Sequence, residues 1–376
     1  MERSNPVSAT TPSPQSSRFA AVYRVLDEAI AARAFPGCAL GVLADGDVVL
    51  QDGLGRFTYD EGARAVTAGT MYDIASLTKV VATTPAAMLL YQRGLLDLDT
   101  PLGELLPGFV VGRPRADRAR DVTLRHLLAH NSGLPGYVEF FKTATTPSAL
   151  FRACLELHLE AEPGKRALYS DPGFILLGKA LEVVMRESLD VWVRREVLRP
   201  PGLSATGFCP PASVRDAIPP TEEDSTLRNR RIQGEVQDEN AWVLKGVAGH
   251  AGLFSNVPDL MRFASEILCT WNESEENPEG KPLFHRETIE AFAQRQGPEG
   301  SSRALGWDTP SESSSSGRHF SRNSIGHLGF SGCSIWIDLD ASVAVVLLTN
   351  RTWPDRQNQA IKEVRPAFHD AVREAL

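Results

Sequence analysis

The sequence predicts a protein of the α/β (α+β) class, in which one antiparallel sheet is flanked by helices and interrupted by an inserted helical domain. Runs of strand-forming residues lie near both ends of the chain, at 39–52 and 324–349, and a helical block separates them. If the strands from both ends form one shared sheet, a single set of helices can cover it and bury its apolar faces. With 376 residues, 42% of them hydrophobic, the chain is long enough for two lobes that share a cleft.

We therefore expect a discontinuous sheet domain formed by residues 18–106 and 232–376, a helical domain at 107–231, and an active site in the cleft between them. Residues 1–17 are rich in Ser, Thr and Pro and predict a disordered tail, not a signal peptide or a membrane anchor. No stretch approaches the ~18 apolar residues of a membrane span, so no membrane partner is expected. If Met1 is the native start, we expect the protein to stay in the cytoplasm.

Residue patterns locate the individual elements. An apolar face predicts a helix at 18–34, and an Asp-Gly pair predicts a hairpin turn between strands at 39–44 and 48–52. A long, mostly buried helix is expected at 76–94, and Pro85 should kink it if the helix continues through that residue. The other expected elements are helices at 123–129, 148–159, 173–186, 191–198 and 358–376, strands at 324–329, 333–338 and 343–349, and surface loops at 273–282 and 309–323.

Charge and cysteine content exclude several classes of protein. The net charge of -8 comes without a basic stripe, so nucleic acid is not an expected partner. The 5 cysteines are scattered, without a Cys-x-x-Cys pair, and predict free buried thiols rather than a disulfide framework or a zinc site. No His-Glu-x-x-His run and no His/Cys cluster occurs, so we expect no metal and no cofactor. Nothing in the sequence indicates the oligomeric state.

Ser76 opens the predicted helix at 76–94, and Lys79 follows three residues later on the same face. At a helix start, the serine Oγ lies close to the positive end of the helix dipole. A buried lysine can lose its proton near neutral pH, because desolvation disfavours the charged amine, and can then act as a base. The spacing therefore indicates a nucleophile and its base. The alternative is a serine that only caps the helix.

Tyr169, Ser170 and Asp171 precede the predicted helix at 173–186. A phenol held near a cation can shuttle a proton, which makes Tyr169 a candidate catalytic residue. The alternative is a structural turn, in which Asp171 caps the helix and Pro172 takes its first position.

Three glycines, Gly326, Gly329 and Gly332, are spaced along a presumed late strand. Glycine weakens a strand, so this spacing indicates either a place where a substrate approaches the backbone closely or a plain β-bulge. Backbone N–H groups there could complete an oxyanion hole with the N–H of Ser76.

Taken together, the Ser-x-x-Lys, Tyr-x-Asp and His-x-Gly motifs resemble the class C β-lactamase-like superfamily of serine hydrolases. That superfamily includes penicillin-binding D,D-peptidases and family VIII carboxylesterases. The resemblance extends through segments 127–135 and 249–255 and covers residues 18–376 in the expected order. It implies a β-lactamase/transpeptidase-like fold. His130 and His250 lie in the two added segments and are expected to hold backbone rather than to take part in chemistry.

The resemblance also implies a role for each motif. Ser76 would be the nucleophile and Lys79 its proton acceptor, while Tyr169 would act as base or as proton relay to the leaving group. The oxyanion hole would use the N–H groups of Ser76 and Phe330.

Two positions depart from the family's pattern. The third residue of the tyrosine motif is usually Asn, whereas an ionised Asp171 cannot donate a hydrogen bond. It would instead pair with Lys79 and raise the pKa of that amine, or face a cationic group of the substrate. On the strand that flanks the substrate, His327 and Gly329 match the family. Leu328 replaces a hydroxyl, however, and a histidine is only partly charged at neutral pH. Both changes favour a neutral ester or amide over a substrate with a carboxylate.

The sequence therefore predicts a serine hydrolase that forms an acyl-enzyme on Ser76 and acts on a small-molecule ester or amide, with carboxylic esters as the first choice. A β-lactamase, a D,D-peptidase or a D-aminopeptidase-like activity is the alternative. A non-catalytic, penicillin-binding-like binding or scaffold protein is the alternative from another class. The presence of Ser76, Lys79 and Tyr169 argues against this last alternative.

Overall fold

The computed structural model describes residues 18–114, 118–272 and 282–376 of the chain. The tail predicted at 1–17, and all but the last residue of the loop predicted at 273–282, lie outside the described residues. Within the described ranges, no helix is both long and apolar enough to cross a membrane.

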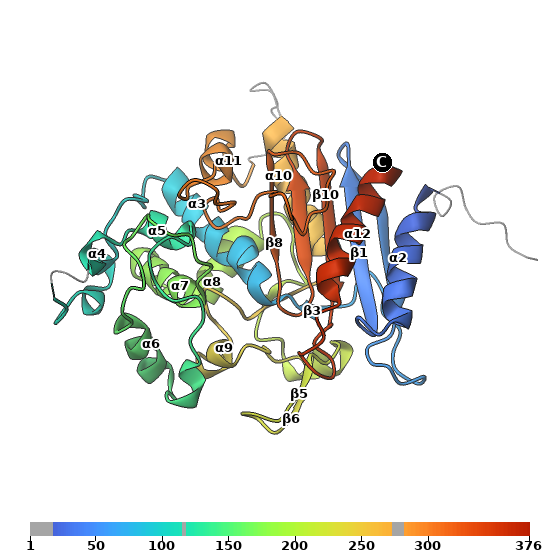
Figure 1. Ribbon diagram of the computed structural model, residues 1–376, viewed down its shortest axis with the longest axis horizontal. Coiled ribbons are helices and arrows are strands. Elements are labelled where there is room, and N and C mark those ends of the chain that lie inside the picture. The colour runs from blue at the N-terminus through green and yellow to red at the C-terminus, as the bar shows by residue number, and fades with distance from the viewer. Residues whose placement is uncertain (1–17, 115–117, 273–281) are drawn as a thin grey trace, which may run out of the picture.

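A five-stranded antiparallel sheet forms the centre of the structure, in the order β2, β1, β10, β9, β8 (Figure 1). The first two strands are β1 (Gly37–Ala44) and β2 (Asp47–Gly55), from the front of the chain. The other three are β8 (Ser324–Leu328), β9 (Ser334–Asp338) and β10 (Val343–Thr349), from its end. Because β1 pairs with β10, the two ends of the chain meet inside the sheet, as the sequence predicts. Both of these strands are buried along their whole length, which explains their continuous apolar runs.

Helices cover both faces of the sheet. α2 (Ala20–Ala31) and α12 (Ile361–Ala375) share an apolar cluster with Leu40 of β1 on one face (Figure 1). Successive residues of a strand point to opposite faces. The next residue, Gly41, accordingly faces α10 (Val257–Asn272), whose side chains a Cβ at this position would meet. The sheet is therefore the middle layer of three.

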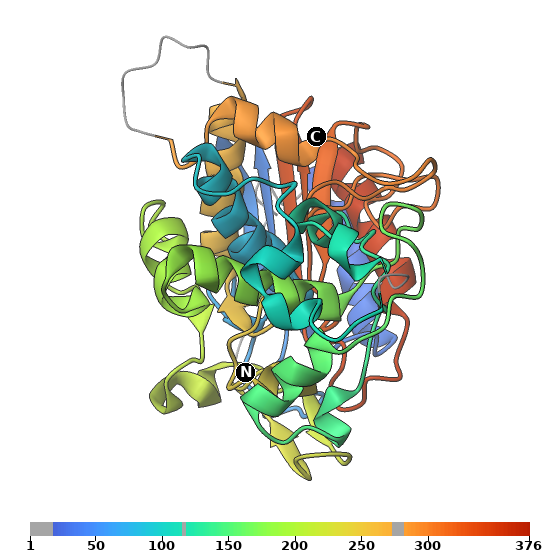
Figure 2. The same cartoon turned by 90° about the vertical axis from the view of Figure 1, so that its left-hand side faces the viewer.

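A region of helices lies beside the sheet, at the left of Figure 1 and facing the viewer in Figure 2. Its apolar side chains form one continuous core with a face of the sheet. A domain division at 106/107 and 231/232 stays a prediction. The helices of this side are α3 (Thr84–Gln92), α4 (Leu102–Leu105), α5 (Leu124–Leu128), α6 (Pro147–Leu155), α7 (Asp171–Met185), α8 (Leu189–Val193), α9 (Glu239–Val243) and α11 (Arg286–Ala293).

Two small sheets complete the structure. β3 (Tyr72–Asp73) pairs with β7 (Leu253–Ser255), and β7 pairs in turn with β4 (Gly207–Phe208). β5 (Glu222–Asp224) pairs with β6 (Arg230–Ile232). The first of these sheets matters for function, because β3 leads directly into the segment that carries Ser76.

The segment predicted as one helix at 76–94 consists of successive 3₁₀, π and α-helical parts. A 3₁₀ turn at Ala75–Leu77 comes first, and a π-helical turn at Lys79–Thr83 follows it. The N–H of Thr84 bonds to the carbonyl of Lys79, five residues back, and α3 begins there. Pro85 follows the π-helical turn, inside a stretch that is helical without a break from Thr78 to Gln92. The helix thus continues through Pro85 with a change of helix type just before it, and the predicted kink stays a prediction.

α10 and α11 were not predicted, because strands were expected to return after the helical block. The signal was present in α10, where Leu260, Phe263, Ala264 and Ile267 repeat at helical spacing and are all buried. A second deviation is that the helix predicted at 191–198 changes from an α-helix to a π-helical turn.

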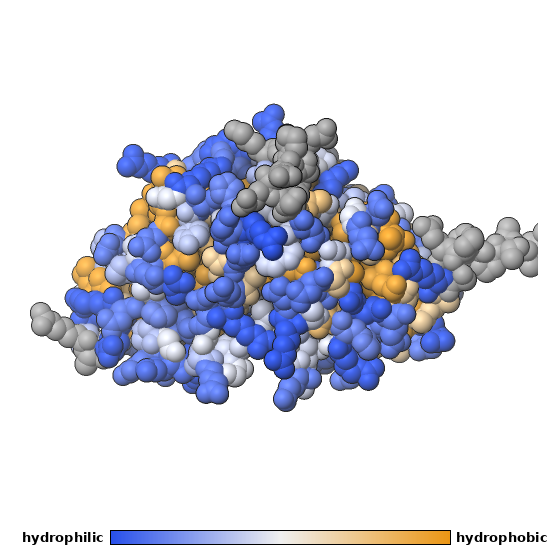
Figure 3. Space-filling view, turned by 90° about the horizontal axis from the view of Figure 1, so that it is seen from above, coloured by the Kyte–Doolittle hydropathy of each residue, from blue (hydrophilic) through white to orange (hydrophobic). Residues whose placement is uncertain are grey.

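The protein surface seen in Figure 3 is mostly hydrophilic, with hydrophobic residues in separate patches. All five cysteines are free. Cys38, Cys154 and Cys333 are buried as predicted, but Cys209 and Cys269 are exposed, so the prediction of buried thiols is wrong for these two.

Phe368 is fully buried where α12 packs on the sheet. We expect Phe368→Ala to lower the free energy of unfolding by about 3–5 kcal/mol, because it removes a buried ring and leaves a cavity. Val111→Ala is the control, since Val111 is 72% exposed and should change stability by no more than about 0.5 kcal/mol. Urea unfolding followed by circular dichroism measures both variants. Equal losses would contradict the packing described here.

Candidate active site

A strained turn presents Ser76. Ala75, just before it, has a φ of 47°, a region that residues other than glycine seldom occupy. The carboxylate of Asp73 holds this conformation, because its Oδ1 accepts the Ala75 N–H at 2.8 Å. Its Oδ2 accepts the N–H of Gln237 at 2.7 Å. Asp73 thus connects the turn before Ser76 to the distant segment at Gln237. Ser76 itself lines a cleft.

Lys79 lies fully buried beside Ser76. Its Nζ donates to Ser76 Oγ at 3.1 Å, to Asp171 Oδ1 at 2.7 Å and to the His250 carbonyl at 3.0 Å. These three acceptors match the three protons of an ammonium group. Lys79 and Ser76 are therefore in contact, as their spacing predicts.

The sequence allows two opposite expectations for the charge of Lys79: a neutral amine because of burial, or a protonated amine because of Asp171. Burial lowers the pKa of the Lys79 amine, but Asp171 and Tyr169 outweigh this effect and raise the pKa above its usual value. The expectation that burial alone would leave a neutral amine is therefore wrong. The other expectation, that Asp171 pairs with Lys79 and raises its pKa, is confirmed by the 2.7 Å ion pair.

Tyr169 lies against the same ammonium group, with its ring centroid 4.8 Å from Lys79 Nζ. Burial raises the pKa of the Tyr169 phenol, and interactions with Lys79 and Ser76 offset part of that rise. The rings of His130 and His327 lie 4.6 and 5.7 Å from the Tyr169 ring. Ser76, Lys79 and Tyr169 thus come together, although Tyr169 is 90 residues further along the chain than Lys79.

The start of α7 explains how Asp171 reaches Lys79. Ser170, not Asp171, caps this helix, because the Ser170 Oγ accepts the Gly173 N–H at 3.1 Å. The prediction of Asp171 as cap is therefore wrong, and its carboxylate is free to pair with Lys79. His130 accepts the Ser170 N–H at Nδ1, at 3.0 Å, which confirms that His130 holds backbone.

His327 lines the cleft beside Leu328 and Gly329, on β8 and its end. Its Nδ1 lies 2.8 Å from the Leu328 carbonyl. A carbonyl can only accept, so Nδ1 carries the proton. Burial, together with the charges of Lys79 and Arg303, holds the pKa of His327 well below its usual value. His327 is therefore neutral, where the sequence analysis expected partial charge.

The loop after β8 packs against the turn before Ser76. A Cβ at Gly329 would lie 2.6 Å from the Ile74 carbonyl, so no larger residue fits there. Arg365, buried in α12, donates to the Gly329 carbonyl at 2.7 Å. In a trans peptide the N–H points away from the carbonyl. The N–H of Phe330, in the same peptide as that carbonyl, therefore points away from Arg365.

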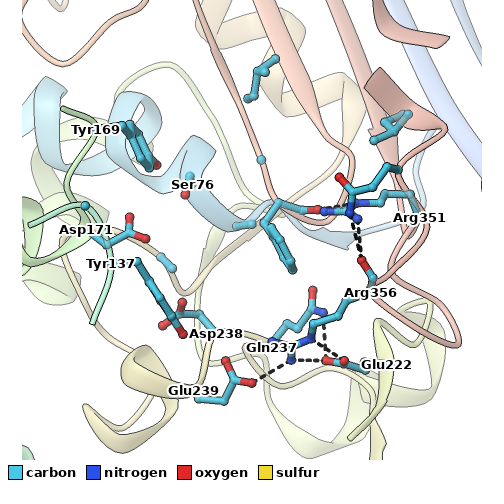
Figure 4. A pocket seen from close by; sticks show the side chains of 18 of the residues that line it. Ser76, Tyr137, Tyr169, Asp171, Glu222, Gln237, Asp238, Glu239, Arg351 and Arg356 are labelled. Atoms are coloured by element: carbon cyan, nitrogen blue, oxygen red, sulfur yellow. Dashed lines mark hydrogen bonds and ion pairs between the residues drawn. The ribbon is translucent and has the colours of Figure 1, made fainter. Parts of the chain in front are cut away.

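The cleft has a volume of about 910 Å³ and carries charges of both signs (Figure 4). Arg356 bonds to Glu222 and, at 2.7 Å, to Glu239, so one guanidinium is shared by two carboxyl groups. Two aromatic side chains that line the cleft, Tyr137 and Phe330, are about half exposed. Within the described part of the chain, no group of three or more His, Cys, Asp or Glu side chains could hold a metal ion.

Several residues of the site were missed in the sequence. A buried arginine on the apolar side of an amphipathic helix is unusual, and this signal could have found Arg365. Asp73, Asp238, Arg303 and Tyr137 carry no comparable signal, because only the tertiary fold brings them to the site.

Asp73 should give the fold a pH dependence. Burial raises the pKa of its carboxyl group to about 6, so the folded state binds this proton more tightly than the unfolded state does. The resulting stabilisation is present below about pH 4 and is lost as the pH rises to about 6. Asp73→Asn cannot titrate and should gain about 2–3 kcal/mol relative to the wild type across that interval. Urea unfolding of both proteins from pH 4 to 8 measures the difference, and a constant difference would contradict the assignment.

The sequence matches the Beta-lactamase family over residues 22–366. Among curated proteins, it is 28% identical to an N-acetylmuramyl-L-alanine amidase of Bacillus subtilis (strain 168). That alignment covers 92% of this chain and 83% of the relative.

Two solved structures show the same fold. One is EstCE1, a hydrolase with promiscuous acyltransferase activity, with a TM-score of 0.75 and 22% identity over 96% of this chain and 99% of the other. The other is the octameric penicillin-binding protein homologue from Pyrococcus abyssi, with a TM-score of 0.70 and 24% identity over 88% of this chain and 72% of the other. The chain has the β-lactamase/transpeptidase-like fold that the sequence predicts, and it belongs to the beta-lactamase family as a serine hydrolase.

Proposed function

We propose that the chain hydrolyses uncharged carboxylic acid derivatives, carboxylic esters first, through an acyl-enzyme on Ser76. The observation that carries this proposal is the contact between Ser76 Oγ and the buried Lys79 Nζ at 3.1 Å, at the wall of a 910 Å³ cleft. A serine hydroxyl in contact with a cation and close to a phenol has the surroundings of an activated nucleophile.

Acylation begins when Ser76 Oγ attacks the acyl carbon of the substrate. Burial raises the pKa of Tyr169, so its phenol holds a proton and acts as a relay. The Ser76 proton passes to the phenol oxygen while the phenol gives its own proton onward, and the neighbouring ammonium of Lys79 stabilises the negative charge that develops on that oxygen. Lys79 keeps its own proton, because Asp171 holds it charged. The N–H groups of Ser76 and Phe330 stabilise the oxyanion. The bond from the acyl carbon to the leaving oxygen breaks as the phenol proton of Tyr169 moves to that oxygen, which releases an alcohol.

Deacylation reverses these proton transfers. A water molecule attacks the acyl carbon and gives a proton to the Tyr169 oxygen, while the phenol proton moves on to Ser76 Oγ. The bond to Ser76 Oγ breaks, that oxygen takes the proton back, and the carboxylic acid leaves. One ester and one water thus become one acid and one alcohol.

The walls of the cleft support an uncharged substrate next to the nucleophile. Leu328 offers no hydroxyl, and the neutral His327 offers no positive charge to a carboxylate. Asp171, 15% exposed as a side chain, adds negative charge at the same place. These features argue against a β-lactamase or a D,D-peptidase. A non-catalytic binding protein would need neither the Ser76–Lys79 contact nor the nearby phenol.

Amide hydrolysis is the second candidate. The Bacillus subtilis relative is an amidase by name and is similar along most of both chains. An amine must be protonated as it leaves, and Tyr169, in contact with the Lys79 ammonium, is placed to give such a proton. The same acyl-enzyme on Ser76 would then form from either substrate.

We expect Ser76→Ala to abolish covalent labelling by a fluorophosphonate probe, because this variant lacks the hydroxyl that attacks phosphorus. Ser225 also lines the cleft, so Ser225→Ala is the matched control and should label like the wild type. Intact-mass analysis measures both variants, and circular dichroism checks their fold. Full labelling of Ser76→Ala at another serine would disprove the assignment of the nucleophile.

We also expect a higher kcat/KM for p-nitrophenyl butyrate than for the β-lactam nitrocefin. Each missing charge-assisted hydrogen bond to the β-lactam carboxylate costs ~1.5–3 kcal/mol, or about one to two decades in rate. Leu328→Thr combined with Asp171→Asn should shift the ratio toward nitrocefin. The anilide of butyric acid, assayed alongside, compares ester with amide hydrolysis. A wild type that prefers nitrocefin would overturn the proposed substrate range.

A further inference from the structure

Arg365 of α12 is a buried cation whose hydrogen-bond acceptors, within the described chain, are all neutral. It is only 6% exposed. Its guanidinium donates to three backbone carbonyls, those of Gly329 at 2.7 Å, Cys333 at 2.8 Å and Gly332 at 3.2 Å. Burial lowers the pKa of this guanidinium to about 10, so it stays charged at neutral pH. A buried charge is usually paired with an opposite charge, because desolvation is costly. The site therefore holds a positive charge without a carboxylate to compensate it.

This charge lies behind the peptide that joins Gly329 to Phe330. The Gly329 carbonyl accepts two hydrogen bonds, from Arg365 Nη2 at 2.7 Å and from the Gly332 N–H at 3.0 Å. The one cis peptide bond of the described chain lies elsewhere, so this peptide is trans. Its N–H, that of Phe330, points away from the guanidinium. No backbone carbonyl in the described ranges accepts this N–H, which leaves it available at the wall of the cleft.

Hydrogen bonds on both sides of Phe330 attach this loop to its surroundings. Ser331 Oγ donates to the carbonyl of Asp73 at 2.8 Å, which ties the loop to the turn before Ser76. Arg351 Nε donates to the Phe330 carbonyl at 2.8 Å, so the next peptide is held as well. The direction of the Phe330 N–H is therefore set by the fold before any substrate binds.

A cation behind a peptide makes the N–H at its front a stronger donor. Arg365 draws electron density toward the Gly329 oxygen, and hydrogen bonds in such a chain strengthen one another. When Ser76 Oγ attacks an acyl carbon, the acyl oxygen becomes negative. With that oxygen bound to the Phe330 N–H, the guanidinium and the oxyanion lie at opposite ends of one peptide. The oxyanion then supplies the negative charge that Arg365 lacks in the free protein, and fixed charges of this kind act strongly in a buried site.

We propose that Arg365 is a positioning residue of the oxyanion hole, which orients and polarises the peptide between Gly329 and Phe330 for the transition state. The inference rests on the proposed function, because it needs acyl transfer at Ser76. Arg365 acts through the peptide rather than by taking part in proton transfer. The C-terminal helix thereby contributes to the rate, and not only to the packing of the sheet.

Two substitutions separate the charge of Arg365 from its bulk. Loss of a whole oxyanion donor costs about 10²–10³-fold in kcat, so a weakened donor should cost Arg365→Met about 10–100-fold in kcat/KM for p-nitrophenyl butyrate. The value of kcat should fall by a similar factor while KM changes little, because acylation and deacylation both form the oxyanion and the bound ester does not. Arg365→Lys keeps a positive charge and should recover part of the loss.

Arg373→Met is the matched control. Arg373 lies on the same helix, pairs with Asp338 at 3.6 Å and does not line the cleft. This variant should keep the wild-type kcat/KM. An equal loss in Arg373→Met would overturn the proposal, because the helix as a whole would then matter and not the guanidinium behind the loop.

Inhibition by 1,1,1-trifluorohexan-2-one distinguishes a role in the oxyanion hole from a merely structural one. Ser76 Oγ adds to the carbonyl carbon of this ketone, the hydroxyl proton leaves by way of Tyr169 to solvent, and the carbonyl oxygen becomes an oxyanion. The adduct thus resembles the transition state. Its inhibition constant should rise in Arg365→Met by the same factor by which kcat/KM falls, and by a smaller factor in Arg365→Lys.

The outcomes separate this inference from the proposed function. If the wild type neither hydrolyses the ester nor reacts at Ser76 with a fluorophosphonate probe, the proposed function fails and the inference fails with it. If the wild type is active and Arg365→Met keeps its kcat/KM, only the role of Arg365 is overturned. A loss that comes from a higher KM, with unchanged inhibition by the ketone, also overturns it. Should circular dichroism show that Arg365→Met does not fold, Arg365→Lys decides, and unequal changes in its kcat/KM and its inhibition constant would refute the role.

Discussion

The site depends on the burial of one ammonium group. Lys79 has no exposed surface, so its charge and its three protons need partners inside the protein. Ser76, Asp171 and the carbonyl of His250 supply them from three separate stretches of chain. The start of α7 and the turn before β7 must therefore both approach the helical segment that carries Lys79. The sheet and the helical region therefore meet at the catalytic residues.

The fold could be predicted where local pattern and tertiary environment agree. β1 and β10 are continuous apolar runs because they are buried on both faces, and their place in one shared sheet was expected, although not that they pair with each other. The π-helical turn at Lys79–Thr83 could not be predicted, because its sequence is as apolar as an ordinary buried helix. α10 was missed for another reason, since its helical spacing is visible but was set aside in favour of strands.

In the site, too, features set by local sequence could be predicted, whereas features set by tertiary contacts could not. Ser76 and Lys79 could be found because they are close in sequence, and Tyr169 because its motif is familiar from relatives. The protonation of Lys79 could not be settled from sequence, because it depends on how close Asp171 comes. The neutrality of His327 likewise follows from burial and from the Leu328 carbonyl. Asp73 and Arg365 act on backbone groups, so only the folded chain shows what they hold.

The π-helical turn also separates two tasks of one continuous segment. An α-helix turns by about 100° per residue, so the direction of one side chain fixes the directions of all the others along the helix. A π-helical turn contains one additional residue, so the side chains after it are rotated relative to those before it. Such turns occur often at functional sites. The direction of Lys79 is thereby uncoupled from the face that α3 turns toward its neighbours. Residues on the packing face of α3 can therefore change while Lys79 Nζ keeps its contact with Ser76 Oγ.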